Sequence, residues 1–232
     1  MQCITVDARK AFMKFAIRIL LGTSILASTN LSFVIAQEIP KDELKKIEKK
    51  LQERETFEVK FSQQLKTGLR KREALSRGTA IFGKPNLFRW VLEHPAKQEM
   101  IFDGTSLVQY DKDAKAATRL APTADKRREL EEVIAAATSI EVLLNRYDLE
   151  KSGRDASSGN VSLTLKPKTS SQGIKSISLK ISAIQNFVEV VNLEFSDGSS
   201  NYIAFSNPQI LKRNANTFKF VPPSGVKVSE MR

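Results

Sequence analysis

The spacing of apolar residues along the chain alternates between a helical period and a strand period. In residues 41–55 (KDELKKIEKKLQERE), Leu44, Ile47 and Leu51 fall on one stripe, and charged residues occupy most other positions. This stripe predicts an amphipathic surface helix. The run of charge within it is interpreted as a solvated face.

From Thr56 onward, apolar and polar residues alternate with a period of two, which is typical of half-buried strands. In residues 87–94 (LFRWVLEH), the side chains of Phe88, Trp90 and Leu92 share one face. About ten short strands are predicted in this way, and the last of them contains Phe218 and Phe220. The dipeptides Asp103-Gly104 and Asp197-Gly198 are strong signals for hairpin turns.

A helical insertion at about residues 123–145 interrupts the strands. Thr123 is a candidate N-cap, and Ser139 is a candidate cap for a second short helix. The apolar residues of the first helix repeat at helical spacing, at Leu130, Val133, Ile134 and Ala137. The pattern therefore predicts a mainly β chain with some α structure. Its antiparallel sheet has one apolar face, so it must curl over that face or stack on another sheet.

The first 36 residues are predicted to be a secretory signal peptide rather than part of the fold. Lys14 and Arg18 precede an apolar run, and the segment ends in Val34-Ile35-Ala36, which favours cleavage before Gln37. Met13 is an alternative start. Residues 37–232 then form the mature domain. The leader carries four basic residues and one acidic residue, so its removal lowers the net charge from +11 to +8.

Composition narrows the possible chemistry. The 232-residue chain is 41% hydrophobic and 27% charged, which favours a globular protein over a disordered one. Its single Cys lies in the predicted leader, so the mature chain has no disulfide or thiolate metal site. Lys and Arg are scattered, and the aromatic residues fall on apolar strand faces, which argues against nucleic-acid binding.

No group of residues forms a recognisable catalytic or metal-binding motif. His94 is interpreted as an exposed loop residue, and Asp111 and Asp113 as parts of a charged turn. Glu131 and Glu132 are adjacent on a predicted helix, so their side chains diverge. We therefore predict a protein that is not an enzyme, with no catalytic residues, no metal and no cofactor.

Four motifs resemble those of the periplasmic outer-membrane lipoprotein carrier family (LolA), and they occur in the family's order. The resemblance covers about residues 41–232, behind a predicted signal peptide and without a lipidated Cys. The motifs are Phe61-Ser62-Gln63, Gly83–Trp90 (GKPNLFRW), Asp103-Gly104 followed by Leu107 and Tyr110, and Phe218–Val226 (FKFVPPSGV).

The resemblance implies an incomplete antiparallel β-barrel with a helical lid, at about residues 123–145, over an apolar cavity. It also implies a monomeric periplasmic carrier that takes acylated lipoproteins from an inner-membrane ABC transporter. The carrier delivers them to an outer-membrane receptor or to the outer membrane itself. By resemblance, Phe88 lies near the cavity entrance and Trp90 contributes to its lining.

The sequence departs from the family pattern in two places. Lys84 stands where the family usually has an Arg that hydrogen-bonds to the lid, and Lys lacks the planar guanidinium fork of Arg. The lid segment also looks longer than usual because of the charged stretch 125–132. A looser or differently built lid lock is therefore expected.

A carrier of acyl chains needs an apolar concave surface, because each exposed methylene costs about 0.8 kcal/mol in water. The residues predicted to line the cavity or its entrance are Phe61, Ile81, Phe82, Phe88, Trp90, Leu92, Met100 and Phe102. The residues assigned to the lid and its lock are Lys84, Leu130, Val133, Ile134, Leu143 and Leu144.

Two other functions fit the same sequence. One is a carrier of another lipid, such as a glycolipid, on the same fold. The other is a module that senses lipoproteins or envelope stress without transporting them. The fold alone does not separate these functions from lipoprotein transport.

Overall fold

A computed structural model describes residues 38–68, 73–169 and 173–231 of the chain. The predicted signal peptide, residues 1–36, and the alternative start at Met13 lie outside the described residues.

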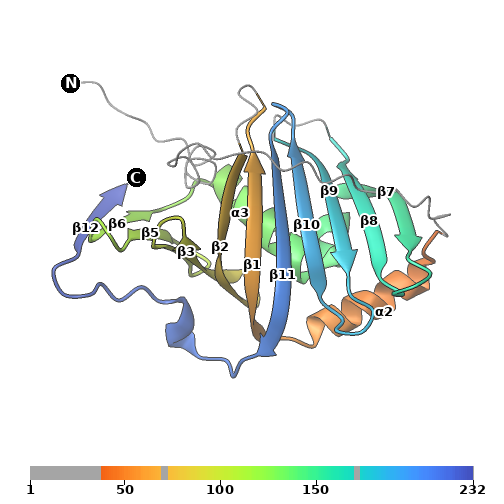
Figure 1. Cartoon of the computed structure of the whole chain (residues 1–232), viewed down its shortest axis with the longest axis horizontal. Helices are drawn as coiled ribbons and strands as arrows, with labels where there is room; N and C mark the ends of the chain where they lie inside the picture. Colours follow the sequence, from red (N-terminus) through yellow and green to blue (C-terminus); the bar gives the residue numbers. More distant parts are fainter. Residues whose placement is uncertain (1–37, 69–72, 170–172, 232) are drawn as a thin grey trace.

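Twelve strands form one sheet, in the order β12-β6-β5-β4-β3-β2-β1-β11-β10-β9-β8-β7 (Figure 1). All neighbouring strands are antiparallel except β12 and β6, which are parallel. The strands are β1 (Thr56–Lys66), β2 (Glu73–Gly83), β3 (Leu87–His94), β4 (Gln98–Phe102), β5 (Leu107–Asp111), β6 (Ala116–Leu120), β7 (Tyr147–Arg154), β8 (Val161–Pro167), β9 (Ile174–Ile181), β10 (Val188–Phe195), β11 (Ser200–Ile210) and β12 (Lys227–Met231).

Three α-helices belong to the described part of the chain: α2 (Lys41–Gln52), α3 (Ala124–Thr138) and α4 (Ile140–Leu144). The hydroxyls of Thr123 and Ser139 cap α3 and α4, as the sequence predicts. Within the described residues, no helix has the length and apolar character needed to cross a membrane.

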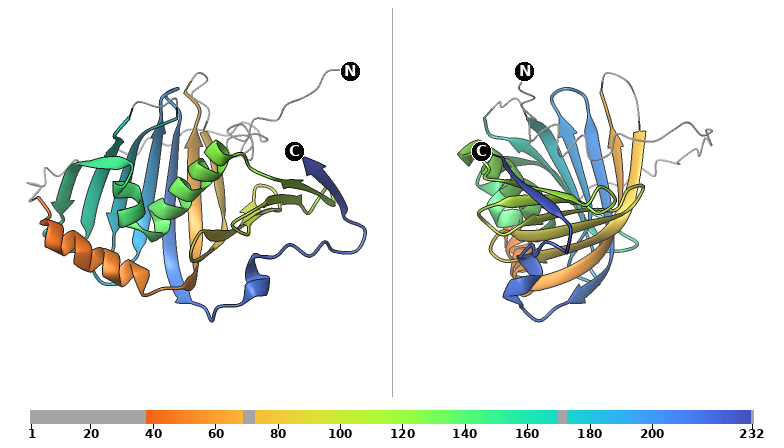
Figure 2. Two further views of the ribbon diagram at one scale, coloured as in Figure 1. Left: turned by 180° about the vertical axis from the view of Figure 1, so that it is seen from behind. Right: turned by 90° about the vertical axis from the view of Figure 1, so that its left-hand side faces the viewer.

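The sheet is an incomplete barrel that curls around helices α3 and α4. Figure 2 shows both helices against the concave face, while α2 lies across the lower ends of several strands. The alternating apolar residues of the strands face inward and build the main hydrophobic core with the three helices. The predicted fold, a mainly β half-barrel with a helical lid, is confirmed.

Both predicted hairpin turns are present. At the first, the Asp103 carboxylate accepts hydrogen bonds from the backbone N–H groups of Thr105 and Ser106, at 2.9 and 2.7 Å. Gly104 adopts a φ of 89°, a conformation that side chains with a Cβ rarely adopt.

The prediction for the last strand is wrong. Phe218 ends a short 3₁₀-helix, η1 (Ala215–Phe218), and Phe220 follows it in irregular structure. Asn214 starts this turn by accepting a hydrogen bond from the Asn216 N–H, so the local hydrogen bonds favour a helical turn over an extended chain. The final strand is β12, which pairs in parallel with β6.

Candidate functional site

A small apolar cavity lies between the lid helix α3 and the concave face of the sheet. The free space within it is about 20 Å³, close to the roughly 10–15 Å³ that one water molecule needs. The lid is therefore closed onto the sheet. The lining residues are Phe82, Phe88, Trp90, Leu130, Val133, Ile134, Ala137, Val191, Ile203 and Phe205.

Aromatic side chains from five strands meet on this concave face. Trp90 contacts Phe61 with ring centroids 3.9 Å apart, and it meets Phe205 edge-on at 6.2 Å. Phe82 meets Phe205 edge-on at 5.8 Å, and Phe88 lies 6.1 Å from Phe102. These contacts form a continuous aromatic surface beneath the lid, which presents apolar area without directional hydrogen bonds.

The structure brings together six of the residues singled out from the sequence. Three come from β2 and β3, and three come from one face of α3. They line the cavity and are Phe82, Phe88, Trp90, Leu130, Val133 and Ile134.

Other predicted residues lie deeper or beside the cavity. Phe61, Leu92, Met100 and Phe102 are buried in the same core but are not among the lining residues. Leu143 of α4 is completely buried, and Leu144 packs against the core from its edge. These residues support the walls of the cavity and the base of the lid.

Ile81 does not belong with these residues, and its assignment to the cavity is corrected. It pairs with Arg89 and Glu58 in the ladder, whereas its neighbours Ala80 and Phe82 face the core. The β2 register shift lies between Arg77 and Gly78, so strand alternation is regular around Ile81. Its side chain therefore points to the convex face and is only half-buried.

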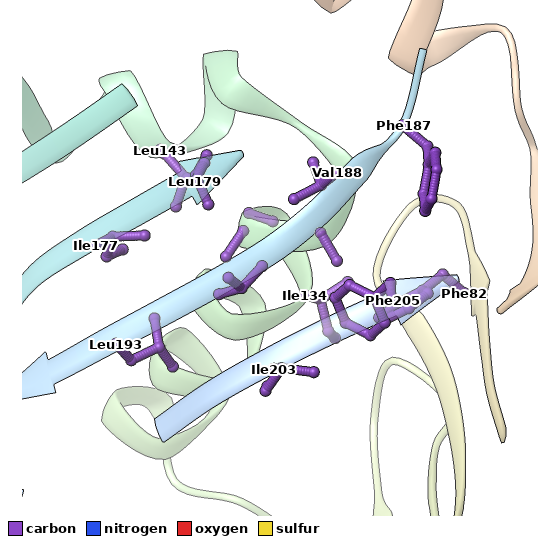
Figure 3. Close-up of a cluster of buried hydrophobic side chains, with 14 of the residues drawn as sticks. Phe82, Ile134, Leu143, Ile177, Leu179, Phe187, Val188, Leu193, Ile203 and Phe205 are labelled. Atoms are coloured by element: carbon purple, nitrogen blue, oxygen red, sulfur yellow. The ribbon is translucent and has the colours of Figure 1, made fainter. Parts of the chain in front are cut away.

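Sequence reasoning did not assign four lining residues to the site: Ala137, Val191, Ile203 and Phe205. It placed Ala137 on the apolar stripe of the lid helix but not in the cavity. Figure 3 shows Ile203 and Phe205 of β11 on the same side of the sheet as Ile134 of the lid helix. The alternation of apolar residues in β10 and β11 was visible in the sequence. It did not show that these strands lie beside β1 in the sheet, under the lid.

A carboxylate on α2 holds the junction between α3 and α4. The two oxygens of Glu48 accept hydrogen bonds from the Ser139 hydroxyl and the Ile140 N–H, both at 2.7 Å. Gln52 joins this group by donating to Glu48 at 2.6 Å and to the Thr138 carbonyl at 3.3 Å. We call Glu48, Gln52, Ser139 and Ile140 the lid anchor.

Lys84 does not bond to a lid helix directly. Its ammonium group donates to the backbone carbonyl of Gln52, at the end of α2. Partial burial lowers the pKa of Lys84, and the nearby carboxylates of Glu48 and Glu55 oppose this shift. Lys84 therefore supports the lid through α2 and the lid anchor.

A second tie joins the lid to the start of β7. Glu132 of α3 forms an ion pair with Arg146 at 2.6 Å, and its other oxygen accepts a hydrogen bond from the Tyr147 hydroxyl at 3.0 Å. The lid is thus held at its C-terminal half by two separate carboxylates. The N-terminal half of α3 carries Lys126, Arg127 and Arg128 and is more exposed.

One polar chain interrupts the apolar concave face, at the upper ends of β1, β2 and β11. Gln63 accepts a hydrogen bond from Ser76 at 3.0 Å and donates to the Asn201 carbonyl oxygen at 2.9 Å. Asn201 is 1% exposed, and its Nδ2 atom has no hydrogen-bond partner among the described residues. Gln63 pairs directly with Ile203, which lines the cavity.

The site offers apolar contact rather than reactive chemistry. The cavity lining contains only aliphatic and aromatic side chains. In the part of the chain that the structure describes, no three His, Cys, Asp or Glu residues gather as a metal site requires. The arrangement is suited to binding an apolar molecule by exclusion of water.

Comparison with known proteins places the chain in a family. The family described as outer membrane lipoprotein carrier protein LolA matches residues 52–221. An outer-membrane lipoprotein carrier protein of Albidiferax ferrireducens is 28% identical over 173 residues, covering 70% of this chain and 77% of the relative. One from Vibrio parahaemolyticus is 29% identical over 203 residues, covering 83% of this chain and 86% of the relative.

A solved structure has the same fold. The crystal structure of an uncharacterized conserved protein from Thermus thermophilus aligns with a TM-score of 0.52. The alignment covers 82% of this chain and 98% of that chain at 12% sequence identity.

Proposed function

Because the chain belongs to the outer membrane lipoprotein carrier protein LolA family, we propose that it carries acylated lipoproteins with their acyl chains held between the lid and the sheet. The observation that carries this proposal is the wholly apolar lining of the cavity beneath the lid helix α3. The lining residues bind acyl chains, and no catalytic step is required.

The energetics favour an enclosed carrier. At about 0.8 kcal/mol per methylene, an acyl chain of about 15 methylenes costs on the order of 12 kcal/mol to expose to water. An aromatic and aliphatic concave face offsets this cost without directional bonds. The carrier can therefore release its cargo without breaking a covalent bond.

Loading requires the lid to move. The free space of about 20 Å³ holds no acyl chain, so Leu130, Val133 and Ile134 leave the sheet when cargo enters. Acyl chains then replace the lid in contact with Phe82, Phe88 and Trp90. The cargo shifts the population toward the open state because it binds that state alone.

The proposal places the protein in the periplasm after removal of residues 1–36. There, a monomer receives lipoproteins from an inner-membrane ABC transporter and delivers them to an outer-membrane receptor or to the membrane itself. In this scheme Phe88 lies near the entrance, Trp90 lines the cavity, and residues 123–145 act as the lid.

A binding experiment tests the role of the cavity. Phe88→Glu places a charge among the lining residues, and we expect it to weaken binding of a fluorescent fatty acyl probe at least about 10-fold. The matched control is Leu75→Glu, on an exposed position of β2 (70% exposed). Thermal unfolding of both variants reports whether each is folded.

A second variant separates binding from folding. Val133 lies on the lid and is half-buried, so Val133→Glu is expected to keep the fold while weakening probe binding. Folded Phe88→Glu and Val133→Glu proteins that bind the probe as tightly as the wild type would contradict an acyl site at this cavity.

A further inference from the structure

Helix α2 presents a one-sided basic surface to solvent. Its five lysines are exposed, and within the described residues none of them has an ion-pair partner. The acidic residues Glu43 and Glu48 bind Arg154 and the lid anchor. Asp42 is exposed among the lysines, so five positive charges and one negative charge face the solvent. We call the five residues the α2 lysine face: Lys41, Lys45, Lys46, Lys49 and Lys50.

The opposite side of α2 is firmly attached to the molecule. Leu44 and Leu51 are buried in the main core, with Ile47 packed against it. Immediately before the helix, the Ile39 N–H donates to the Ser152 hydroxyl at 2.9 Å. All apolar residues of α2 are therefore used in folding, and the lysines project from a fixed base.

We propose that the α2 lysine face docks the protein on a membrane surface rich in anionic phospholipid headgroups. Protein–protein interfaces favour Tyr, Trp and Arg and are depleted in Lys. The α2 lysine face contains neither aromatic residues nor Arg. A row of flexible lysines suits a diffuse layer of phosphate charge better than it suits a shaped protein pocket.

The binding is electrostatic and does not insert the helix into the bilayer. Helices that bury themselves in a membrane interface present an apolar face to the lipid. The apolar side of α2 is already packed against the protein core. The attraction therefore falls off within about one Debye length, roughly 8–10 Å near physiological salt, and is lost at high ionic strength.

The position of the face relates docking to the lid. Glu48 lies on the same helix, at the edge of the lysine face, and holds the α3–α4 junction. Docking through α2 thus brings the base of the lid close to the membrane surface. The docking proposal stands on the charge of α2 and does not depend on what the cavity binds.

Vesicle co-sedimentation tests the proposal. The wild-type protein is mixed with vesicles of phosphatidylcholine alone or with about one third phosphatidylglycerol. The test variant carries Lys45→Gln, Lys46→Gln and Lys49→Gln, because Gln and Lys have similar helix propensities. The control variant carries Lys60→Gln, Lys175→Gln and Lys212→Gln, three exposed lysines outside α2.

We expect the wild type to bind the anionic vesicles and to dissociate from them at about 0.5 M salt. The α2 variant should bind at least about 10-fold more weakly, since each lysine near an anionic surface contributes on the order of a fivefold factor. The control variant should stay within about twofold of the wild type. The proposal would be overturned if the wild type did not bind anionic vesicles or bound neutral vesicles equally well. It would also be overturned if the two lysine variants lost the same amount of affinity for anionic vesicles.

Discussion

At the scale of single residues, we expect the closed state of the lid to depend on Glu48. Its carboxylate accepts hydrogen bonds from Ser139, Ile140 and Gln52 and so joins α2 to the α3–α4 junction. Lys84 reaches this group only through the Gln52 carbonyl. The sequence pointed to Lys84 because of its place in a motif. It gave no signal for Glu48, which lies more than 90 residues before Ser139 and Ile140.

Glu48→Gln is expected to loosen the lid. The amide loses the charge of the carboxylate and presents one acceptor oxygen, so hydrogen bonds worth about 1.5–3 kcal/mol are weakened. We expect a lower free energy of unfolding and stronger binding of an apolar fluorescent dye to the more open cavity. The matched control is Glu53→Gln, at the exposed end of the same helix. Dye binding that is identical in the wild type and Glu48→Gln would remove Glu48 from the lid anchor.

Phe205 tests the part of the site that sequence reasoning missed. It meets Phe82 and Trp90 edge-on and lines the cavity. We expect Phe205→Ala to lower the free energy of unfolding by about 3–5 kcal/mol. Tyr202→Ala, on the other face of the same strand and 42% exposed, should cost less than about 1 kcal/mol. Urea unfolding measures the free energy of unfolding of both variants. Similar decreases would contradict the conclusion that Phe205 faces the core and Tyr202 faces away from it.

At the scale of elements, the sequence predicted what local patterns encode. Alternation located the strands, the Asp-Gly pairs located two hairpins, and Thr123 and Ser139 located the helix caps. The exceptions depend on long-range pairing. Strand β12 aligns with β6 more than 100 residues earlier, and nothing near Lys227 encodes that partner. The placement of β10 and β11 under the lid likewise follows from sheet order and not from local spacing.

The turn between β7 and β8 gives a pH-dependent prediction. Hydrogen bonds from the side chains and backbone N–H groups of Ser157 and Ser158 lower the pKa of Asp155 well below its usual range. The ionised form thus stabilises the fold above about pH 4, the pKa of an unfolded Asp. This contribution is lost progressively as the pH falls from 4 toward the folded pKa.

Asp155→Asn is therefore expected to make the free energy of unfolding less dependent on pH below about pH 4. Urea unfolding between pH 2.5 and 6 should show a smaller loss of stability on acidification in Asp155→Asn than in the wild type. Asp148→Asn, at an exposed position of β7, serves as the control and should follow the wild-type profile. If the free energy of unfolding of Asp155→Asn fell as steeply on acidification as that of the wild type, this explanation would be contradicted.

At the scale of the whole molecule, one curved sheet and three helices form two different surfaces. The concave face beneath α3 is apolar and covered. The outer side of α2 is basic and open. The full chain has a net charge of +11. The structure assigns part of it to one helix that also holds the lid.

The sequence identified the family and six of the ten cavity-lining residues. Its motifs lie mainly in β1 to β5, so the residues inferred from them came from that half of the sheet. The three lining residues on β10 and β11 could be identified only from the three-dimensional arrangement. The orientation of Ile81 also had to come from the structure. Ile81 precedes the lining residue Phe82 on the same strand, so its side chain points to the opposite face.

The most direct test of the central claim is a release assay. The purified protein is incubated with spheroplasts that make labelled lipoproteins, and the supernatant is analysed for soluble complexes. We predict that wild-type protein releases lipoproteins in a complex of defined stoichiometry and that folded Phe88→Glu releases far less. A supernatant without lipoproteins, beside a control carrier that releases them from the same spheroplasts, would contradict the claim that this chain is a lipoprotein carrier.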